Sequence, residues 1–243
     1  MRRSRCWSVL ASFTLAACGA AAPDAAPREP APEPLELTLV LLKTGPRTEP
    51  LGDAERGKVF GGHFGNMQRL AREGHLLVAG PYGRAKSDPA LRGLFVLDTA
   101  DRDRARQLAE TDPGFQAGVF ALDYHRLTTT APLRAFLAAE MAALDAAAAA
   151  GRTPPPGEGS RLFVLLTAEN GDAALAALEG LPGVLWLSRL DGERAFALLD
   201  AQDRQAAQTL LQPVADRLGA CRLDEWFASS RLAELPAMAR AGG

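Results

Sequence analysis

His63 is the residue whose type and position most directly suggest chemistry. A histidine changes its charge between about pH 5 and 8, so it can act as a general acid or base. His63 lies four residues before Met67 and seven before Leu70, on or beside the stripe of a predicted helix that packs on a sheet. These residues leave two interpretations open: a proton-transfer group, or an inert histidine that is hydrogen-bonded at the edge of the core.

Asp112 is the carboxylate that follows the second predicted helix. The C-terminal end of a helix disfavours an anion, so another group must stabilise a carboxylate at this position. An Asp-Pro pair such as Asp112-Pro113 also commonly starts a turn. From the residues alone, Asp112 therefore has either a chemical or a purely structural role.

A loop after a predicted strand contributes further polar side chains. Its sequence is Gly80-Pro81-Tyr82-Gly83-Arg84. If the loop borders a cleft, Tyr82 or Arg84 would bind a carboxylate or phenolate of a substrate. The alternative is that both side chains are simply solvated.

Asp123 and His125 alternate with Phe120, Leu122 and Tyr124 in the last predicted strand of the first half. Successive strand residues point to opposite faces, so this polar pair shares the face opposite the three apolar or aromatic residues. We expect the pair at a solvent-exposed strand end, and the alternative is a position lining the interior of a barrel.

The three histidines, His63, His75 and His125, have no short metal-ligand spacing. The chain also lacks a Walker loop, a dinucleotide-binding fingerprint and a nucleophile elbow. We therefore expect no metal and no cofactor.

Two segments, 35–128 and 161–227, look like diverged copies of one unit that must position these residues. LTLVLLKTG at 37–45 resembles RLFVLLTAENG at 161–171, and both copies follow the order strand, helix, strand, strand, helix, strand. This order is that of a ferredoxin-like unit, in which two helices cover one face of an antiparallel sheet. The second copy has no histidine, Asp-Pro or Gly-Pro at matching places, so any catalysis belongs to the first copy.

Both faces of each predicted sheet must be covered, because the strands at 37–42 and 162–166 are apolar on both sides. Two helices can cover only one face, so each sheet needs a partner for its other face. We predict an α+β fold of two tandem ferredoxin-like domains packed sheet to sheet, as an intrachain pseudo-dimeric α+β barrel. In the alternative, each copy pairs with its counterpart in a second molecule.

The N-terminus resembles a bacterial lipoprotein signal. A cationic start precedes an apolar or small stretch at 7–17 that is too short to span a bilayer. Leu15-Ala16-Ala17-Cys18 resembles the lipobox, which implies a lipidated Cys18, and multiple acyl chains there would give stable attachment. A plain signal peptide with an incidental cysteine is the alternative. We therefore expect the protein to be anchored in the bacterial cell envelope. Because no acidic residue follows Cys18, the periplasmic side of the outer membrane is favoured.

The predicted organisation follows from these boundaries. It comprises a signal peptide (1–17), an Ala/Pro tether (18–34), a first domain (35–128), an Ala-rich helix with a Pro/Gly linker (129–160), a degenerate second domain (161–227) and a C-terminal tail (228–243). Once Cys6 leaves with the signal and Cys18 carries lipid, only Cys221 remains, so no intrachain disulfide is expected. The net charge of −2 makes nucleic acid an unexpected partner.

The first half resembles the YCII-related domain. HFGNMQRLAREGHLLVAGP at 63–81 and DPGFQAGVF at 112–120 match its helix-borne histidine, its Gly-Pro after the second strand and its Asp-Pro after the second helix. The similarity covers about residues 37–128. One departure is Gly114, which stands where an aromatic residue often follows the Asp-Pro, with Phe115 one place later.

This resemblance implies ferredoxin-like subunits that pair into α+β barrels, with a His–Asp pair in a cleft. It makes His63 and Asp112 the catalytic candidates and the loop of Gly80, Pro81, Tyr82 and Arg84 the substrate-binding candidate. If the pair forms, the carboxylate would orient the imidazole for proton transfer. We expect a lyase or isomerase for a small acidic or hydroxylated ring compound. A ligand-binding or assembly lipoprotein without turnover is the alternative, and a heme-binding or oxygenase-like relative is a weaker one because no convincing axial ligand is present.

Overall fold

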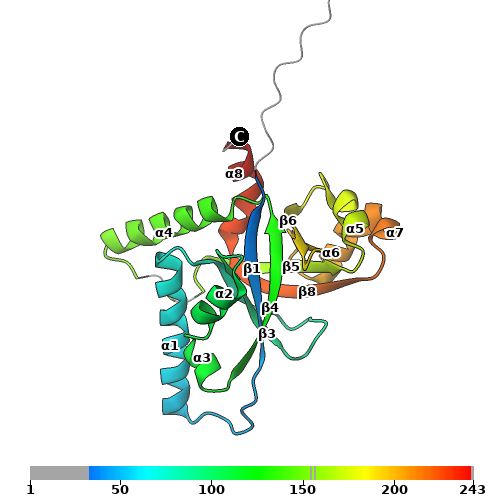
Figure 1. The fold of residues 1–243 in the computed structure, drawn as a ribbon. Helices are drawn as coiled ribbons and strands as arrows, with labels where there is room; N and C mark the ends of the chain where they lie inside the picture. The colour runs from blue at the N-terminus through cyan, green and yellow to red at the C-terminus, as the bar shows by residue number, and fades with distance from the viewer. Residues whose placement is uncertain (1–32, 154, 156, 242–243) are drawn as a thin grey trace, which may run out of the picture. The chain divides into compact units, whose positions relative to one another are not determined.

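The computed structural model describes residues 33–153, 155 and 157–241. The predicted signal peptide, Cys18 and nearly all of the tether lie outside the described residues. The described residues form one compact unit. Its elements, shown in Figure 1, are β1 (Leu35–Thr44), α1 (Asp53–Arg72), β2 (Leu76–Pro81), β3 (Leu91–Leu97), α2 (Arg102–Ala109), α3 (Pro113–Gln116), β4 (Phe120–Thr129), α4 (Leu133–Ala149), β5 (Ser160–Ala168), α5 (Gly171–Leu178), β6 (Val184–Leu190), β7 (Arg194–Leu199), α6 (Arg204–Leu211), η1 (Gln212–Val214), α7 (Ala215–Leu218), β8 (Cys221–Ser229), η2 (Ser230–Glu234) and α8 (Leu235–Ala241).

All eight strands belong to one antiparallel sheet with the order β2-β3-β1-β4-β6-β7-β5-β8. The predicted α+β class is confirmed. The two halves are not stacked as separate sheets, however. They are joined edge to edge where Leu127, Thr128 and Thr129 of β4 pair with β6. Such pairing satisfies backbone groups that two separate sheets would leave open at their edges.

The two outer strands, β2 and β8, also meet, which nearly closes the sheet into a barrel. Tyr82, just after β2, forms an isolated bridge with Trp226 of β8. The amide of Gly83 donates to the carbonyl oxygen of Glu225 at 2.7 Å, and the Trp226 indole N–H donates to the carbonyl oxygen of Gly80 at 2.9 Å. Glycine at position 80 permits this approach, because a side chain there would overlap the Phe227 carbonyl.

Alternation along each strand divides the core between the two faces of the sheet. On β1, Leu37 and Leu39 belong to an interior cluster to which all eight strands contribute. Val40 and Leu42 point outward into a second cluster beneath α1 and α2. A third cluster fills the space between the second half of the sheet and α5, α6 and α7. In Figure 1, α1–α3 and α5–α7 form two separate groups of helices beside the strands.

Apolar side chains of α4, η2 and α8 join the interior cluster. They include Leu133 and Phe136 of α4, Leu232 of η2 and Leu235 of α8. The segment expected as a C-terminal tail therefore begins with the end of β8 and continues through η2 and α8. Leu37 of β1 also packs in this cluster. Lys43 lies about 20 Å further along the same strand and lines the opposite, polar end of the barrel.

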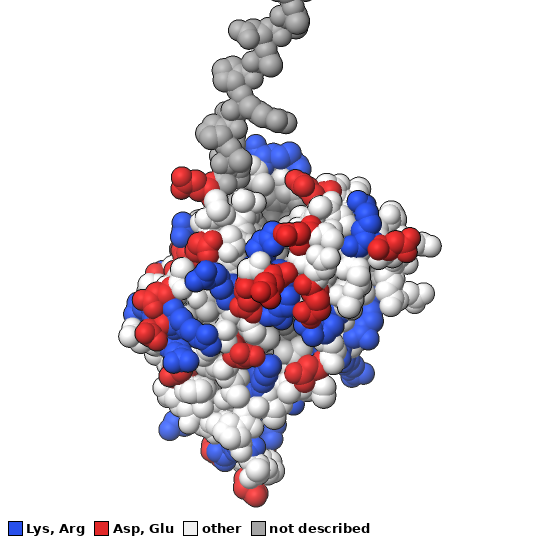
Figure 2. Space-filling view, turned by 45° about the vertical axis from the view of Figure 1, so that its right-hand side comes forward, with Lys and Arg blue, Asp and Glu red and all other residues white. Residues whose placement is uncertain are grey.

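The surface carries both signs of charge. On the face shown in Figure 2, acidic and basic side chains are interspersed, and a group of acidic residues surrounds basic ones near its centre. Among the described helices, none is both long enough and apolar enough to cross a bilayer.

Candidate functional site

His63 and Asp112 are in direct contact. His63 Nδ1 lies 2.6 Å from Asp112 Oδ2, and the two residues are 8% and 0% exposed. An ionised carboxylate can only accept hydrogen bonds, so Nδ1–H is the donor. This tautomer leaves Nε2 of a neutral imidazole with a lone pair that can take a proton. Within the described part of the chain, Nε2 has no hydrogen-bond partner.

Asp112 is also the N-cap of α3. Its Oδ1 accepts hydrogen bonds from the amides of Gly114 at 2.7 Å and Phe115 at 3.4 Å. The sequence predicted that this carboxylate follows α2, where an anion is disfavoured, or starts a turn, and the short helix that stabilises it was not expected. The signal was present, because Asp followed by Pro is a common N-cap with proline in the first helical position.

Close packing of α1 on α3 brings the two side chains together. A Cβ added to Gly62 would stand 2.9 Å from Cγ of Pro113, so glycine lets α3 lie directly against the turn of α1 that carries His63. Charged residues of α1 also complement its helix dipole, with Asp53 in the first turn and Arg72 in the last.

Four phenylalanines surround the imidazole. The ring stacks on Phe95 of β3 at 6.0 Å between centroids and lies near Phe120 at 5.3 Å, with Phe60 at 6.4 Å. Phe64, at 5.4 Å, is 45% exposed. An exposed aromatic ring next to a mostly buried histidine offers an apolar contact for a ring compound that reaches the imidazole edge.

The predicted substrate-binding loop does not lie beside the His63–Asp112 pair. Phe95, on which His63 stacks, belongs to the outer cluster, whereas Tyr82 packs against the interior cluster on the opposite face of the sheet. Gly80 contributes to barrel closure, and Pro81 and Arg84 are exposed. Burial, with the neighbouring Asp224 carboxylate, raises the pKa of the Tyr82 phenol above its ordinary value.

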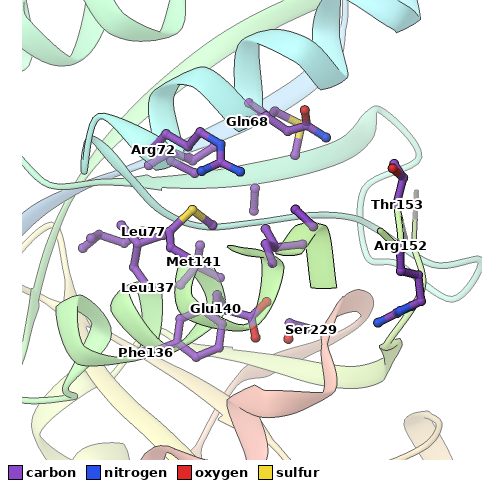
Figure 3. Close-up of a pocket in the computed structure, with 17 residues that line it drawn as sticks. Gln68, Arg72, Leu77, Phe136, Leu137, Glu140, Met141, Arg152, Thr153 and Ser229 are labelled. Atoms are coloured by element: carbon purple, nitrogen blue, oxygen red, sulfur yellow. The ribbon is translucent and has the colours of Figure 1, made fainter. Parts of the chain in front are cut away.

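A cavity of about 350 Å³ lies between α1 and α4 (Figure 3). Gln68 and Arg72 of α1 face Phe136 and Met141 of α4 across it. It begins one helical turn from His63, at Met67, but neither His63 nor Asp112 lines it.

Asp123 and His125 line the interior of the barrel at its polar end, which was the alternative interpretation, but the side chain of Asp123 is 44% exposed at this strand end whereas that of His125 is 16% exposed. Lys43 donates to Asp123 Oδ2 at 3.0 Å, and His125 Nδ1 lies 2.8 Å from Asp191 Oδ2. Burial alone raises the pKa of Asp123, but the hydrogen bond from Lys43 and the nearby His125 outweigh it and hold this pKa below its ordinary value. For Asp191, burial is likewise outweighed by the hydrogen bond and charge of His125 and by Arg194, so its pKa is also lowered.

Sequence reasoning missed Lys43, Asp191, Arg194 and Asp224 as neighbours of this end of the barrel. A signal existed on two strands. Lys43 continues the inward alternation of Leu37, Leu39 and Leu41, and Asp224 continues that of Trp226 and Ala228. In this chain, a charged residue therefore follows the inward apolar residues of β1 and of β8 at the polar mouth of the barrel.

Within the described ranges, no cluster of three or more His, Cys, Asp or Glu side chains is arranged to hold a metal ion. Cys221 is a free cysteine at the surface. The predicted lipidation site, Cys18, lies outside these ranges.

The fold and the site define a class: an α+β protein whose eight antiparallel strands nearly close into a barrel, with a buried His–Asp pair on its outer face. Comparison with protein families narrows this class. Residues 37–125 match the family model of the YCII-related domain, so this part of the chain is a YCII-related domain. No curated protein and no solved structure matches the chain.

Proposed function

We propose that this protein is a YCII-related lyase or isomerase of the bacterial envelope, with His63 as its general acid and base and Asp112 as the residue that positions it. The carrying observation is the 2.6 Å contact that directs Nδ1 of His63 to the carboxylate and leaves Nε2 for a ligand. Fold analogy supplies the reaction class.

In this reaction the ligand first loses a proton to the protein, and the product or the leaving group then takes one up. Nε2 of His63 removes a proton from a carbon or hydroxyl group, and the resulting imidazolium is stabilised by the buried Asp112 carboxylate. The imidazolium, whose N–H proton exchanges with water, then gives a proton to another atom of the ligand in an isomerisation, or to the leaving group in an elimination. Phe64, exposed beside the imidazole, supports a ligand with a ring.

We further propose that the barrel is an intrachain pair of ferredoxin-like domains. The order of the strands supports this proposal. The first half has the strand order β2-β3-β1-β4 and the second has β6-β7-β5-β8, which is the same order for corresponding strands. In this interpretation the second half, which lacks the His–Asp pair, completes the interior core for the first.

The proposed activity is tested with a panel of small phenols, lactones and organic acids. Thermal shift selects ligands, and NMR in deuterated water follows incorporation of solvent deuterium into each. We expect His63→Gln to slow exchange by about 10²–10⁴-fold. His75→Gln is the matched control, because His75 contacts only Arg104 by a side-chain bond and should leave the rate unchanged. Exchange in His63→Gln at the wild-type rate would overturn the proposal.

Asp112→Asn tests the positioning role separately. In wild-type protein a low-field imidazole N–H proton resonance should report the Nδ1–H···Oδ2 bond. Asparagine keeps an oxygen that can cap α3, but its neutral amide no longer stabilises the imidazolium. We expect the low-field signal to be lost or shifted and exchange to slow, while the fold is retained. An unchanged signal would show that the carboxylate does not hold the ring.

A ligand-binding lipoprotein without turnover is the second candidate function. It is favoured by one observation: neither His63 nor Asp112 lines the α1–α4 cavity or the cavity at the barrel mouth. In that case a selected ligand would bind wild-type and His63→Gln protein equally, and no deuterium would enter it.

Attachment to the envelope through a lipid on Cys18 is also a proposal, supported by the sequence of the N-terminus. Cells treated with globomycin should accumulate the full-length precursor, and Cys18→Ser should behave in the same way without the drug. Normal processing in both experiments would contradict lipidation of Cys18 and would support the alternative of a plain signal peptide.

A further inference from the structure

The polar end of the barrel contains a partly open cavity of about 320 Å³ that the proposed reaction does not use. It lies on the interior face of the sheet, whereas His63 stacks on the outer face. Both halves and the loop after β2 line it. Its polar lining includes Lys43, Tyr82, Asp123, His125, Arg222 and Asp224.

The carboxylates of this lining are already hydrogen-bonded within the protein. Asp123 accepts from Lys43 at 3.0 Å. Asp224 accepts from both the amide and the hydroxyl of Ser87, and Asp88 accepts from the amide of Ala90 at 2.7 Å. Their capacity to bind a cation is therefore largely used.

Several donors of the lining are not used in this way. The Tyr82 hydroxyl makes no hydrogen bond to the described residues, and Arg222 makes a single ion pair, with Glu169 at 3.2 Å. Lys43 donates only to Asp123, which leaves two of its three N–H groups. The Tyr82 phenol is protonated at neutral pH, and burial raises its pKa further, so its hydroxyl is also a donor.

His125 is held in place at the edge of the same cavity. Its Nδ1 contacts Asp191, whose φ of 52° is the only positive φ of a non-glycine residue in the described chain. Such a backbone conformation costs energy and persists only where the surroundings enforce it. Nε2 of His125 is fully buried and has no hydrogen-bond partner among the described residues, although Asp123 Oδ2 lies 3.4 Å away.

The rest of the cavity wall is apolar. It is formed by Leu39 and Leu41 of β1, Leu190 of β6 and Phe196 of β7. Unused donors on one side of a partly open cavity and apolar side chains on the other match a ligand that has an anionic end and a hydrophobic body.

We propose that the barrel mouth is a binding site for a small organic acid. The carboxylate of the ligand accepts hydrogen bonds from Tyr82, Arg222 and Lys43, and its apolar body lies against Leu39, Leu41 and Phe196. This site goes beyond the proposed function, because it lies across the sheet from the His63–Asp112 pair and does not require that pair to be catalytic.

Benzoate is the probe, and benzamide, which has the same ring without the charge, is its matched control. Wild-type protein should be stabilised against heat by benzoate more than by benzamide. Arg222→Gln and Tyr82→Phe should each weaken benzoate binding by about tenfold. Arg84→Gln is the control variant, because Arg84 is exposed and does not line the cavity, and it should bind benzoate as the wild type does.

A second measurement needs no variant. Benzoate should shift the NMR signals of the Leu39 and Leu41 methyl groups and of the His125 ring, while that of His75 stays in place. Equal effects of benzoate and benzamide, or shifts confined to residues outside the barrel mouth, would overturn the proposal. His63→Gln should retain benzoate binding, so a failure of the proton-transfer proposal is distinguishable from a failure of this one.

Discussion

A methyl group on Gly80 would overlap the carbonyl oxygen of Phe227, because β8 passes directly against β2 at this point. The same glycine accepts the indole hydrogen bond of Trp226 through its own carbonyl oxygen. The Gly-Pro that the sequence suggested for substrate binding is thus a packing element of barrel closure.

Gly80→Ala should lower the free energy of unfolding by roughly 1–3 kcal/mol, since the backbone of β8 must move to accept the methyl group. Urea denaturation followed by tryptophan fluorescence measures this effect. Gly61→Ala is the control for an added methyl group, because open space surrounds that position on α1. Equal stability of Gly80→Ala and wild type would mean that β8 does not approach β2 this closely.

The adjacent glycines Gly61 and Gly62 should respond to alanine in opposite directions. Gly61→Ala should raise stability by about 0.5–1 kcal/mol, because alanine restricts the unfolded chain and favours a helix. Gly62→Ala should lower stability and disturb the low-field imidazole signal of His63, because its methyl group presses on the ring of Pro113. The same urea curves and NMR spectra compare both variants, and similar behaviour of the two would contradict the close α1–α3 packing.

Acid should weaken the cluster at the barrel mouth. The pKa values of Asp123 and Asp191 are lowered in the folded protein, so their stabilising contribution is present above about pH 4 and is lost as the pH falls through the lower folded-state values. The urea midpoint should fall between about pH 6 and pH 3, and it should fall less in Asp191→Asn. Because both carboxylates are partly exposed, we expect a difference below about 1 kcal/mol. An identical fall in both proteins would exclude this contribution.

The tyrosines should resist ionisation. The chain has only two, Tyr82 and Tyr124. Burial, with the nearby Glu110, raises the pKa of Tyr124 to about 12, and burial and Asp224 raise that of Tyr82. Their contribution to stability is therefore present below the ordinary value of about 10 and is lost as the pH rises through the folded-state values.

Ultraviolet absorbance should accordingly show no tyrosinate near pH 10 while the protein stays folded. Tyr124→Phe leaves Tyr82 as the single reporter. A group that titrates near pH 10 in this variant, with native circular dichroism, would place the Tyr82 hydroxyl in bulk solvent.

Local patterns in the sequence determined the α+β class and which strand faces are buried. The alternation of Leu37, Leu39 and Leu41 with Val40 and Leu42 predicted burial on both sides of β1, because successive side chains of a strand point to opposite faces. The match of residues 37–125 to the YCII-related domain confirms the resemblance that the His, Gly-Pro and Asp-Pro motifs suggested.

Tertiary structure alone decided which distant residues meet. Asp112 lies 49 residues from His63, and its contact depends on a short helix and on the absence of a side chain at Gly62. The pairing of β4 with β6 and the assembly of Lys43, His125 and Arg222 around one cavity likewise depend on how the two halves join. Periodicity reports the direction in which a side chain points, but the register and closure of the sheet determine what it touches.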